Sequence, residues 1–298
     1  MSDQTCPIAK LDSLLLSTDG SEFSEGAVRE AVSLAKTCSS RLFAVFVVET
    51  NPEYETMAPQ LVEKEIEKAR QHLEEVKGRA AGDGIACETI VHQGEDSYRY
   101  VVDEAARRDA DMIIMGRRGR TGLKRLMMGS VTAKVIGHAP CSVLVVPRAA
   151  RVEMKRVLVA SDGSRHSDAA AMEAIGIAKR CGAKLTVLSV VPSEAISPFD
   201  IVHSEMQREL IAEKEKKAAE CNIKNARDAA ESQGISVEGL IQEGKPYEAI
   251  VNTATGKKVD LIVVGSHGRT GLEKLLMGSV TERVIGLSPC AVLVVKVK

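Results

Sequence analysis

The chain of 298 residues contains no tryptophan, and aromatic side chains make up only 3% of it. It also lacks an excess of charge of either sign, because its formal net charge at pH 7 is -1. A protein whose main ligand is nucleic acid usually carries a basic excess that attracts phosphates. We therefore expect no nucleic-acid partner.

Long apolar runs are absent as well. No run reaches the roughly 18–20 residues that a membrane-spanning helix requires. The first residues, MSDQTCPIAKLDS, do not show the charged and then apolar layout of a secretory signal peptide. These absences predict a cytoplasmic protein without a membrane partner.

Cysteine is present, but not in a metal-binding or redox pattern. Cys38 and Cys181 occupy one repeated position, and Cys141 and Cys290 occupy another. None of the cysteines forms a C-x-x-C pair. We interpret them as small buried apolar residues, with a redox or metal role as the alternative. No metal site is expected.

The chain contains two copies of one unit. The segment GRRGRTGLKRLMMGSVTAKVIGHAPCSVLVV, residues 116–146, returns as GSHGRTGLEKLLMGSVTERVIGLSPCAVLVV, residues 265–295. The start of the first half, LLLSTDGSEFSEGAVREA, is likewise matched by VLVASDGSRHSDAAAMEA in the second. We expect two tandem domains, residues 1–148 and 153–298, each long enough to bury its own core.

Each copy alternates short apolar runs with helical patterns. In the first copy, strands are expected at 14–17, 42–48, 87–93, 111–116 and 142–146, and helices at 24–38, 62–80 and 97–109. Short strands rich in Val, Ile and Leu, separated by helices, indicate a buried parallel sheet with helices on both faces. The predicted class is α/β.

Unusual residues follow two strands of each copy. The first strand runs into Asp19 or Asp162, and the fourth runs into a G-x-x-G segment that is followed by Gly-Ser at 129–130 or 278–279. Ligands bind at the carboxyl ends of the strands in open parallel sheets. Glycines there can adopt positive φ and admit a ligand close to the backbone.

The chemistry of this segment suits a nucleotide. A helix predicted to start at Gly129, with Ser130 as its cap, offers free N–H groups and partial positive charge to a phosphate. Arg117, Arg118, Arg120 and Lys124 add positive charge. The carboxylates of the two aspartates would repel phosphate, so we expect them to accept hydrogen bonds from a sugar hydroxyl or a base amine. Purely structural turns are the alternative.

The pattern G-x2-G-x9-G-[ST] after an apolar fourth strand, with an Asp after the first, resembles the universal stress protein family. The resemblance covers nearly the whole chain, once per half. It implies five parallel strands in the order 3-2-1-4-5 in each half and an ATP site between strands 1 and 4, with ADP or AMP as other occupants. The implied nucleotide-binding residues are Asp19, Val47, Met115, Gly116, Gly119, Arg120, Gly129, Ser130 and Val131, and in the second half Asp162, Val190, Val264, Gly265, Gly268, Arg269, Gly278, Ser279 and Val280.

The resemblance also implies pairing of domains through their last strands, here within one chain, with a homodimer of chains as a further possibility. The function it favours is a nucleotide-binding stress-response sensor or regulator that acts on an unknown protein partner. The alternative is a slow ATPase or another ATP-dependent enzyme of this fold. Magnesium could accompany the nucleotide by binding phosphate oxygens and water. No catalytic residue is predicted, because Ser130 and Ser279 have no evident paired base.

Overall fold

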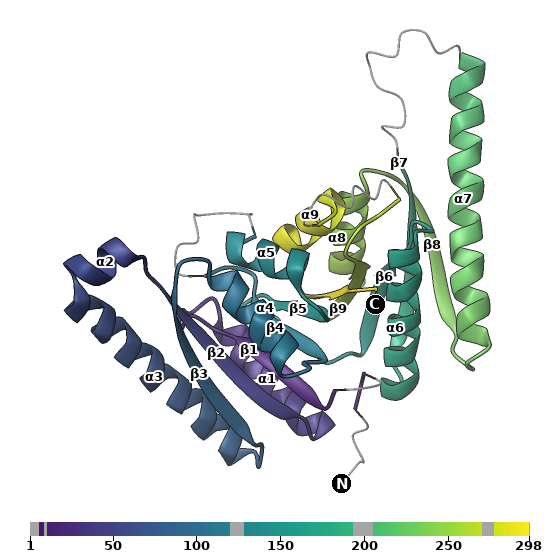
Figure 1. Ribbon diagram of the computed structural model, residues 1–298. Coiled ribbons are helices and arrows are strands. Elements are labelled where there is room, and N and C mark those ends of the chain that lie inside the picture. The colour runs from purple at the N-terminus through teal and green to yellow at the C-terminus, as the bar shows by residue number, and fades with distance from the viewer. Residues whose placement is uncertain (1–5, 9–10, 120–127, 193–204, 270–276, 298) are drawn as a thin grey trace.

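The computed structural model describes residues 6–8, 11–119, 128–192, 205–269 and 277–297. Ten strands in these ranges form one sheet in the order β3-β2-β1-β4-β5-β10-β9-β6-β7-β8. Each half therefore has the order 3-2-1-4-5, which confirms the expected α/β architecture. Figure 1 shows β5 near the middle of the molecule and the helices α3 and α7 at its two outer sides.

The strands are short and mostly apolar. Their bounds are β1 Ser13–Ser17, β2 Arg41–Glu49, β3 Cys87–Gly94, β4 Met112–Gly116, β5 Ser142–Val146, β6 Arg156–Ala160, β7 Lys184–Pro192, β8 Val237–Gly244, β9 Leu261–Gly265 and β10 Ala291–Val295. The central strands β4, β9 and β10 are buried along their whole length, as expected when helices cover both faces of a parallel sheet.

The helices follow the strands in the expected alternation. Their bounds are α1 Glu25–Cys38, α2 Pro52–Met57, α3 Pro59–Gly82, α4 Ser97–Arg107, α5 Ser130–His138, α6 Arg165–Cys181, α7 Glu205–Glu231, α8 Pro246–Gly256 and α9 Ser279–Leu287. The run at 62–80 is indeed the surface helix α3, with buried residues on one side and charged residues on the others.

The two halves join edge to edge through β5 and β10. These strands run antiparallel, with Leu144 opposite Leu293, whereas every other described strand pair is parallel. An antiparallel junction of two similar sheets relates the halves by an approximate two-fold axis perpendicular to the sheet. Such an axis keeps equivalent helices on the same face.

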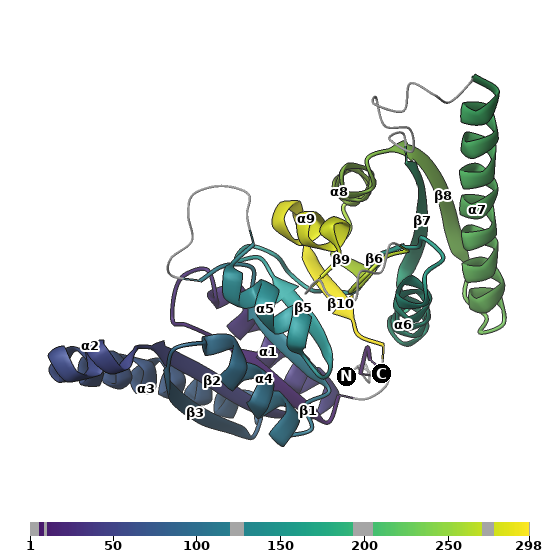
Figure 2. The same cartoon turned by 45° about the horizontal axis from the view of Figure 1, so that its top comes forward.

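Each face of the sheet consequently carries one apolar core that runs across both halves. One core packs α1, α3, α6 and α7 against the sheet, and the other packs α4, α5, α8 and α9 against the opposite face. Figure 2 shows the continuous sheet from a second direction. The halves share their cores, and this continuity fixes the orientation of one half on the other.

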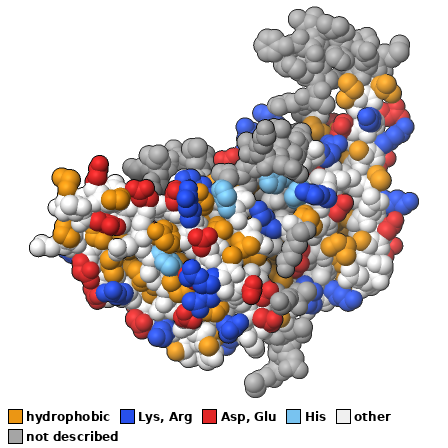
Figure 3. Space-filling view, in the orientation of Figure 1, with side chains coloured by type: hydrophobic (Ala, Val, Ile, Leu, Met, Phe, Trp, Pro, Cys, Tyr) orange, Lys and Arg blue, Asp and Glu red, His pale blue; other side chains and the backbone are white. Residues whose placement is uncertain are grey.

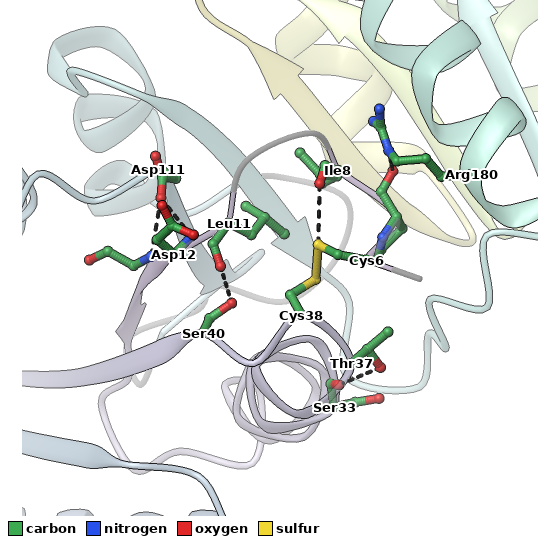
Figure 4. The surroundings of a disulfide bond; sticks show 12 residues. Cys6, Ile8, Leu11, Asp12, Ser33, Thr37, Cys38, Ser40, Asp111 and Arg180 are labelled. Carbon is green, nitrogen blue, oxygen red and sulfur yellow. Dashed lines mark hydrogen bonds between the residues drawn. A yellow bond between two sulfur atoms is a disulfide. The ribbon is translucent and has the colours of Figure 1, made fainter. Parts of the chain in front are cut away.

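The cysteine interpretation is wrong for one of the two repeated positions. Cys38 forms a disulfide with Cys6 (Figure 4), and Cys181, its counterpart, is an exposed thiol. Cys141 and Cys290 are buried thiols as expected, and burial raises the pKa of the Cys290 thiol to about 11. The disulfide was missed because Cys6 lies before the repeated unit, so the comparison of copies gives no partner for Cys38.

Charge is mixed over the surface. On the face in Figure 3, acidic and basic side chains alternate without a large field of one sign, in keeping with the net charge of -1. Among the helices that the structure describes, none is both long and apolar enough to cross a membrane. Within the described residues, no group of three or more His, Cys, Asp or Glu side chains could hold a metal ion.

Candidate functional site

A cavity of about 260 Å³ lies at the carboxyl ends of β1, β2 and β4 in the first half. The start of α5, the first turns of α4 and Glu65 of α3 also contribute to its wall. Of the residues predicted from the sequence, eight line it: Asp19, Val47, Met115, Gly116, Gly119, Gly129, Ser130 and Val131. The ninth, Arg120, lies outside the described residues.

The backbone of Val47 faces this cavity because β1 ends before β2 does. Thr18 N–H donates to the Val45 carbonyl at 3.0 Å, so the polar groups of Val45 point toward β1. Alternate residues of a strand point their backbone groups the same way, so those of Val47 point to the same side, beyond Ser17, the last residue of β1. A flat ring in the cavity would meet a backbone donor and acceptor there.

Gly129 is the N-cap of α5, with φ of -65° and ψ of 144°. A Cβ on it would come no closer than 3.4 Å to any neighbour, the nearest being Arg118 Cα. Gly278, the N-cap of α9, is nearly identical, with φ of -66° and a nearest distance of 3.4 Å to His267 Cα. The expectation that these glycines adopt positive φ is wrong. The expectation that Ser130 caps α5 is also wrong, because Gly129 is the N-cap. Ser130 is instead the exposed first residue of α5.

A buried threonine ties each of these helices to the strand before the glycine segment. Thr132 Oγ1 donates to the Gly116 carbonyl at 3.1 Å, and Thr281 Oγ1 donates to the Gly265 carbonyl at 2.9 Å. Both hydroxyls are buried, so an unmade bond would be costly. These residues were missed from the sequence, although the repeated GSVT in both copies carried the signal.

The other motif glycines are required by close packing. A Cβ on Gly116 would lie 2.9 Å from the Phe23 carbonyl oxygen, and one on Gly119 would lie 2.7 Å from Asp19 Oδ2. Asp19 Oδ1 accepts from Ser21 N–H at 3.0 Å and from its hydroxyl at 2.7 Å. The aspartate thus lies directly against the glycine segment and orders the loop after β1.

In the second half, Asp162 lies against the glycine segment in the same way and accepts a backbone hydrogen bond from it. Asp162 Oδ2 accepts from the backbone N–H of Arg269 at 2.9 Å, and its Oδ1 accepts from Ser164 N–H at 3.0 Å. Burial alone would raise the pKa of Asp162, but these hydrogen bonds outweigh it, so the pKa lies below its ordinary value. The Arg269 guanidinium donates to Glu215 of α7 at 2.7 Å, and this ion pair holds the arginine side chain against α7.

The hollow beside the second glycine segment is wider and differently lined. It measures about 510 Å³ and is lined by Gly163, Ser164, Arg165, His166, His267, Gly268 and Arg269. Of the nine residues predicted for this half, only Gly268 and Arg269 are among them. Asp162, Val190, Val264, Gly265, Gly278, Ser279 and Val280 keep positions equivalent to those of the first half without lining this hollow. Residues 193–204 and 270–276, which border the region in sequence, lie outside the described residues.

Two arginines of the first glycine segment have different surroundings. Arg118 lines the cavity, whereas Arg117 Nη1 donates to the Ser288 carbonyl, at the end of α9 in the other half, at 2.9 Å. Burial and the charge of Arg118 lower the pKa of Arg117. Of these two arginines, Arg118 is therefore the one placed to meet a phosphate. Lys124 falls outside the described residues.

The contact from Arg117 has a counterpart in the opposite direction. Lys296, just after β10, donates to the carbonyls of Ile136 and Gly137 at the end of α5, at 2.9 and 3.1 Å. Cations are favourable at helix C-termini because carbonyl groups end there unpaired. Arg117 of the first half therefore places a positive charge at the C-terminus of α9, and Lys296 of the second half places one at the C-terminus of α5.

The side walls of the two sites also differ. In the first half, Thr18 Oγ1 and His72 Nε2 are 2.9 Å apart, and the His72 ring meets Phe46 edge-on at 6.1 Å. In the second half, Asn222 Nδ2 donates to Ser189 Oγ at 3.2 Å in the equivalent place. Burial lowers the pKa of His72, which favours its neutral form. A comparison of the copies along α3 and α7 would have found this difference.

Comparison with known sequences decides the family. The profile of the universal stress protein family matches residues 11–147 and again residues 153–296. The chain belongs to the universal stress protein family. The expected resemblance is confirmed in both halves.

Single-domain relatives match one half at a time. A universal stress protein of Methanocaldococcus jannaschii is 42% identical over 142 residues, covering 48% of this chain and 82% of that protein. Universal stress protein YxiE of Bacillus subtilis is 35% identical over 146 residues, covering 47% and 98%. A solved universal stress protein from Archaeoglobus fulgidus matches 96% of this chain and 99% of its own, with a TM-score of 0.73 and 23% identity. That likeness shows that the whole tandem fold occurs elsewhere.

Proposed function

We propose that this universal stress protein binds an adenine nucleotide, such as ATP, ADP or AMP, with one site per half, residues 1–148 and 153–298. The observation that carries the proposal is the pair Gly129 and Gly278. Neither glycine is required by its φ, and neither is required by packing, because a Cβ would meet the protein at ordinary distances. Glycine in both copies is explained by a ligand that approaches the backbone at these two points.

The surroundings of Gly129 fit a phosphate group. The residues that follow begin α5, whose first N–H groups have no partner within the helix and carry its partial positive charge. Arg118 adds a full positive charge at the cavity wall. The nucleotide supplies a polyanion, and this chain supplies oriented donors that do not need to rearrange on binding.

The remaining parts of the cavity fit the nucleoside. The strand order puts β2 and β4 on either side of β1, so a ligand with phosphates at α5 extends across β1 toward β2. Asp19 at the end of β1 then meets the ribose, and the backbone of Val47 meets the edge of the base. Met115 and Val131 provide apolar contacts from the wall.

The proposed role is that of a sensor or regulator. A nucleotide bound at the carboxyl ends of the strands would change the surface that an unknown protein partner in the cytoplasm recognises. The β5–β10 junction would take the place of the contact between two separate chains. Magnesium, where present, would be held by phosphate oxygens and water, and slow hydrolysis would be incidental to binding.

The test is to identify what the purified protein holds. Mass spectrometry of the supernatant after denaturation gives the nucleotide and its amount per chain, and calorimetry with ATP, ADP and AMP gives the number of sites. We expect two sites per chain. The absence of binding at millimolar nucleotide would refute the proposal, and one site per chain would restrict it to one half.

A further inference from the structure

We propose that Glu49 reads the amino group of the nucleobase in the first-half site, that Ser97 positions it, and that the second half lacks this contact. The inference rests on the proposed nucleotide function and adds to it a residue that determines specificity. Glu49 is the last residue of β2, and Ser97 is the first residue of α4. Both side chains line the cavity together with Val47.

The geometry directs the Glu49 carboxylate into the cavity. Glu49 follows Val47 by two residues, so the two side chains project from the same face of the strand, the face that α4 covers. The buried Ser97 hydroxyl donates to Glu49 Oε1. A carboxylate has about four acceptor positions, so one bond from Ser97 leaves it able to accept from a ligand.

The charge of Glu49 identifies the part of the nucleotide that it can meet. A carboxylate repels phosphate, and the strand order puts β2, which carries Glu49, on the opposite side of β1 from β4 and the glycine segment that follows it. Glu49 also borders a neighbouring hollow that Ser130 of α5 lines. The base end lies at β2, beside the backbone of Val47. A group that accepts hydrogen bonds at this end requires a donor on the base. The exocyclic amine of adenine is such a donor, and the carbonyl that replaces it in hypoxanthine is not.

The second half has lost both members of this pair. The strand register places Glu49 opposite Gly94 and Pro192 opposite Gly244, so Pro192 is the counterpart of Glu49. The first residue of α8 is Pro246, the counterpart of Ser97. A proline side chain neither donates nor accepts. The two sites are therefore expected to differ in how strictly they select adenine.

The experiment compares ATP with inosine triphosphate, which lacks the amine, by calorimetry fitted for two sites. In Glu49→Gln, we expect the preference of the first site for ATP to fall about 10-fold, the lower range for a hydrogen bond to a charged acceptor. Ser97→Ala should lower it less, and Ser97→Thr, which keeps the hydroxyl, should restore it. The matched control is Glu95→Gln, an exposed carboxylate in the neighbouring hollow that does not line the cavity, and it should change nothing.

Other results would overturn the inference. An unchanged preference in Glu49→Gln, or an equal loss for both nucleotides, would show that the carboxylate does not contact the amine. If the variant instead loses its preference for ATP over 2′-deoxyATP, the carboxylate holds the sugar and the inference is wrong. In all three cases ATP still binds the parent protein. Failure of the parent to bind either triphosphate would instead refute the proposed function itself.

Discussion

The two halves of the chain share a backbone and differ in the side chains around it. The threonine-to-carbonyl bonds, the aspartate against the glycine segment and the glycine N-caps occur in both. The side walls of the two sites differ, because Ser189 and Asn222 occupy the positions in the second half that Phe46 and His72 occupy in the first. The repeated features hold the loops in shape, so the differences are where the halves can diverge in what they bind.

The disulfide is the largest expected difference in stability. Cys6 and Cys38 close a loop with a sequence separation of 32, and Arg180 of the other half donates to the Pro7 carbonyl at 2.8 Å within the same segment. Cys38→Ser should lower the free energy of unfolding by about 3 kcal/mol, because a cross-link of this length restricts the unfolded chain. Chemical denaturation under oxidising conditions measures the change.

The control for this variant is built into the repeat. Cys181→Ser alters the equivalent exposed thiol and should leave stability within about 0.5 kcal/mol of the parent. Reductant should destabilise the parent but not Cys38→Ser. Equal stability of Cys38→Ser and the parent without reductant would mean that the disulfide does not stabilise the fold.

The glycine N-caps should show that the sites are separate. Gly129→Ala should weaken nucleotide binding by about 30-fold at the first site only, through loss of charge-assisted hydrogen bonds from the α5 N-terminus. Gly278→Ala should do the same at the second site. Calorimetry with ATP resolves the two.

Stability should fall by no more than about 1 kcal/mol in either variant, because the added Cβ meets the protein at ordinary distances and only the preference for glycine over alanine at an N-cap is lost. Gly78→Ala is the control for binding, since a Cβ there meets nothing within 4 Å; because Gly78 lies inside α3, this change should raise stability by about 1 kcal/mol. Full-strength binding by Gly129→Ala would contradict the approach of a ligand to this backbone.

The sequence was informative where physical patterns repeat and silent where they do not. Apolar runs located the strands, and the two copies located the glycine segments, because burial and turn geometry leave periodic traces. Cys6 could not be paired with Cys38, since it has no counterpart in the other copy. The positive φ expected at Gly129 was wrong because spacing does not distinguish glycine needed for conformation from glycine needed for space. The partner of Arg117 depended on how the halves join.

The arginines of the first segment should separate binding from assembly. Arg118→His, which copies the second half, should weaken the first site by about threefold and reduce its dependence on ionic strength, because the interaction of a partly exposed cation with phosphate is screened by salt. Arg117→Ser should leave both unchanged and lower the free energy of unfolding by about 1 kcal/mol, since the Ser288 carbonyl loses its donor.

Titrations at low and high salt, together with denaturation curves, measure these effects. If Arg117→Ser alters the salt dependence of the first site, its guanidinium meets the nucleotide and not Ser288. If neither variant does, neither Arg117 nor Arg118 takes part in nucleotide binding.

The smallest expected difference is in pH dependence. The second hollow contains His166 and His267, with ring centroids 5.3 Å apart, where the first half has Phe23 and Arg118. Burial and the neighbouring His267 lower the pKa of His166, so its imidazole is neutral at pH 7. A bound polyphosphate favours the protonated form, so affinity at the second site should rise as the pH falls below 6.5, the ordinary value. We expect roughly a threefold change in affinity between pH 7.5 and 5.5, the size of a weak charge contact of about 0.7 kcal/mol.

The first site provides the internal reference for this change, since protonation of the nucleotide itself affects both sites alike. His166→Phe, which copies the first half, should remove the difference between them. The pH dependence of folding stability without ligand has the opposite sign. Because the pKa of His166 is lowered in the folded state, the unfolded chain binds more protons. Stability should therefore fall as the pH drops from 6.5 toward the pKa of the folded state. Opposite trends for binding and stability in the parent, both reduced in His166→Phe, would establish that this imidazole faces the phosphates; parallel trends would place it in the fold alone.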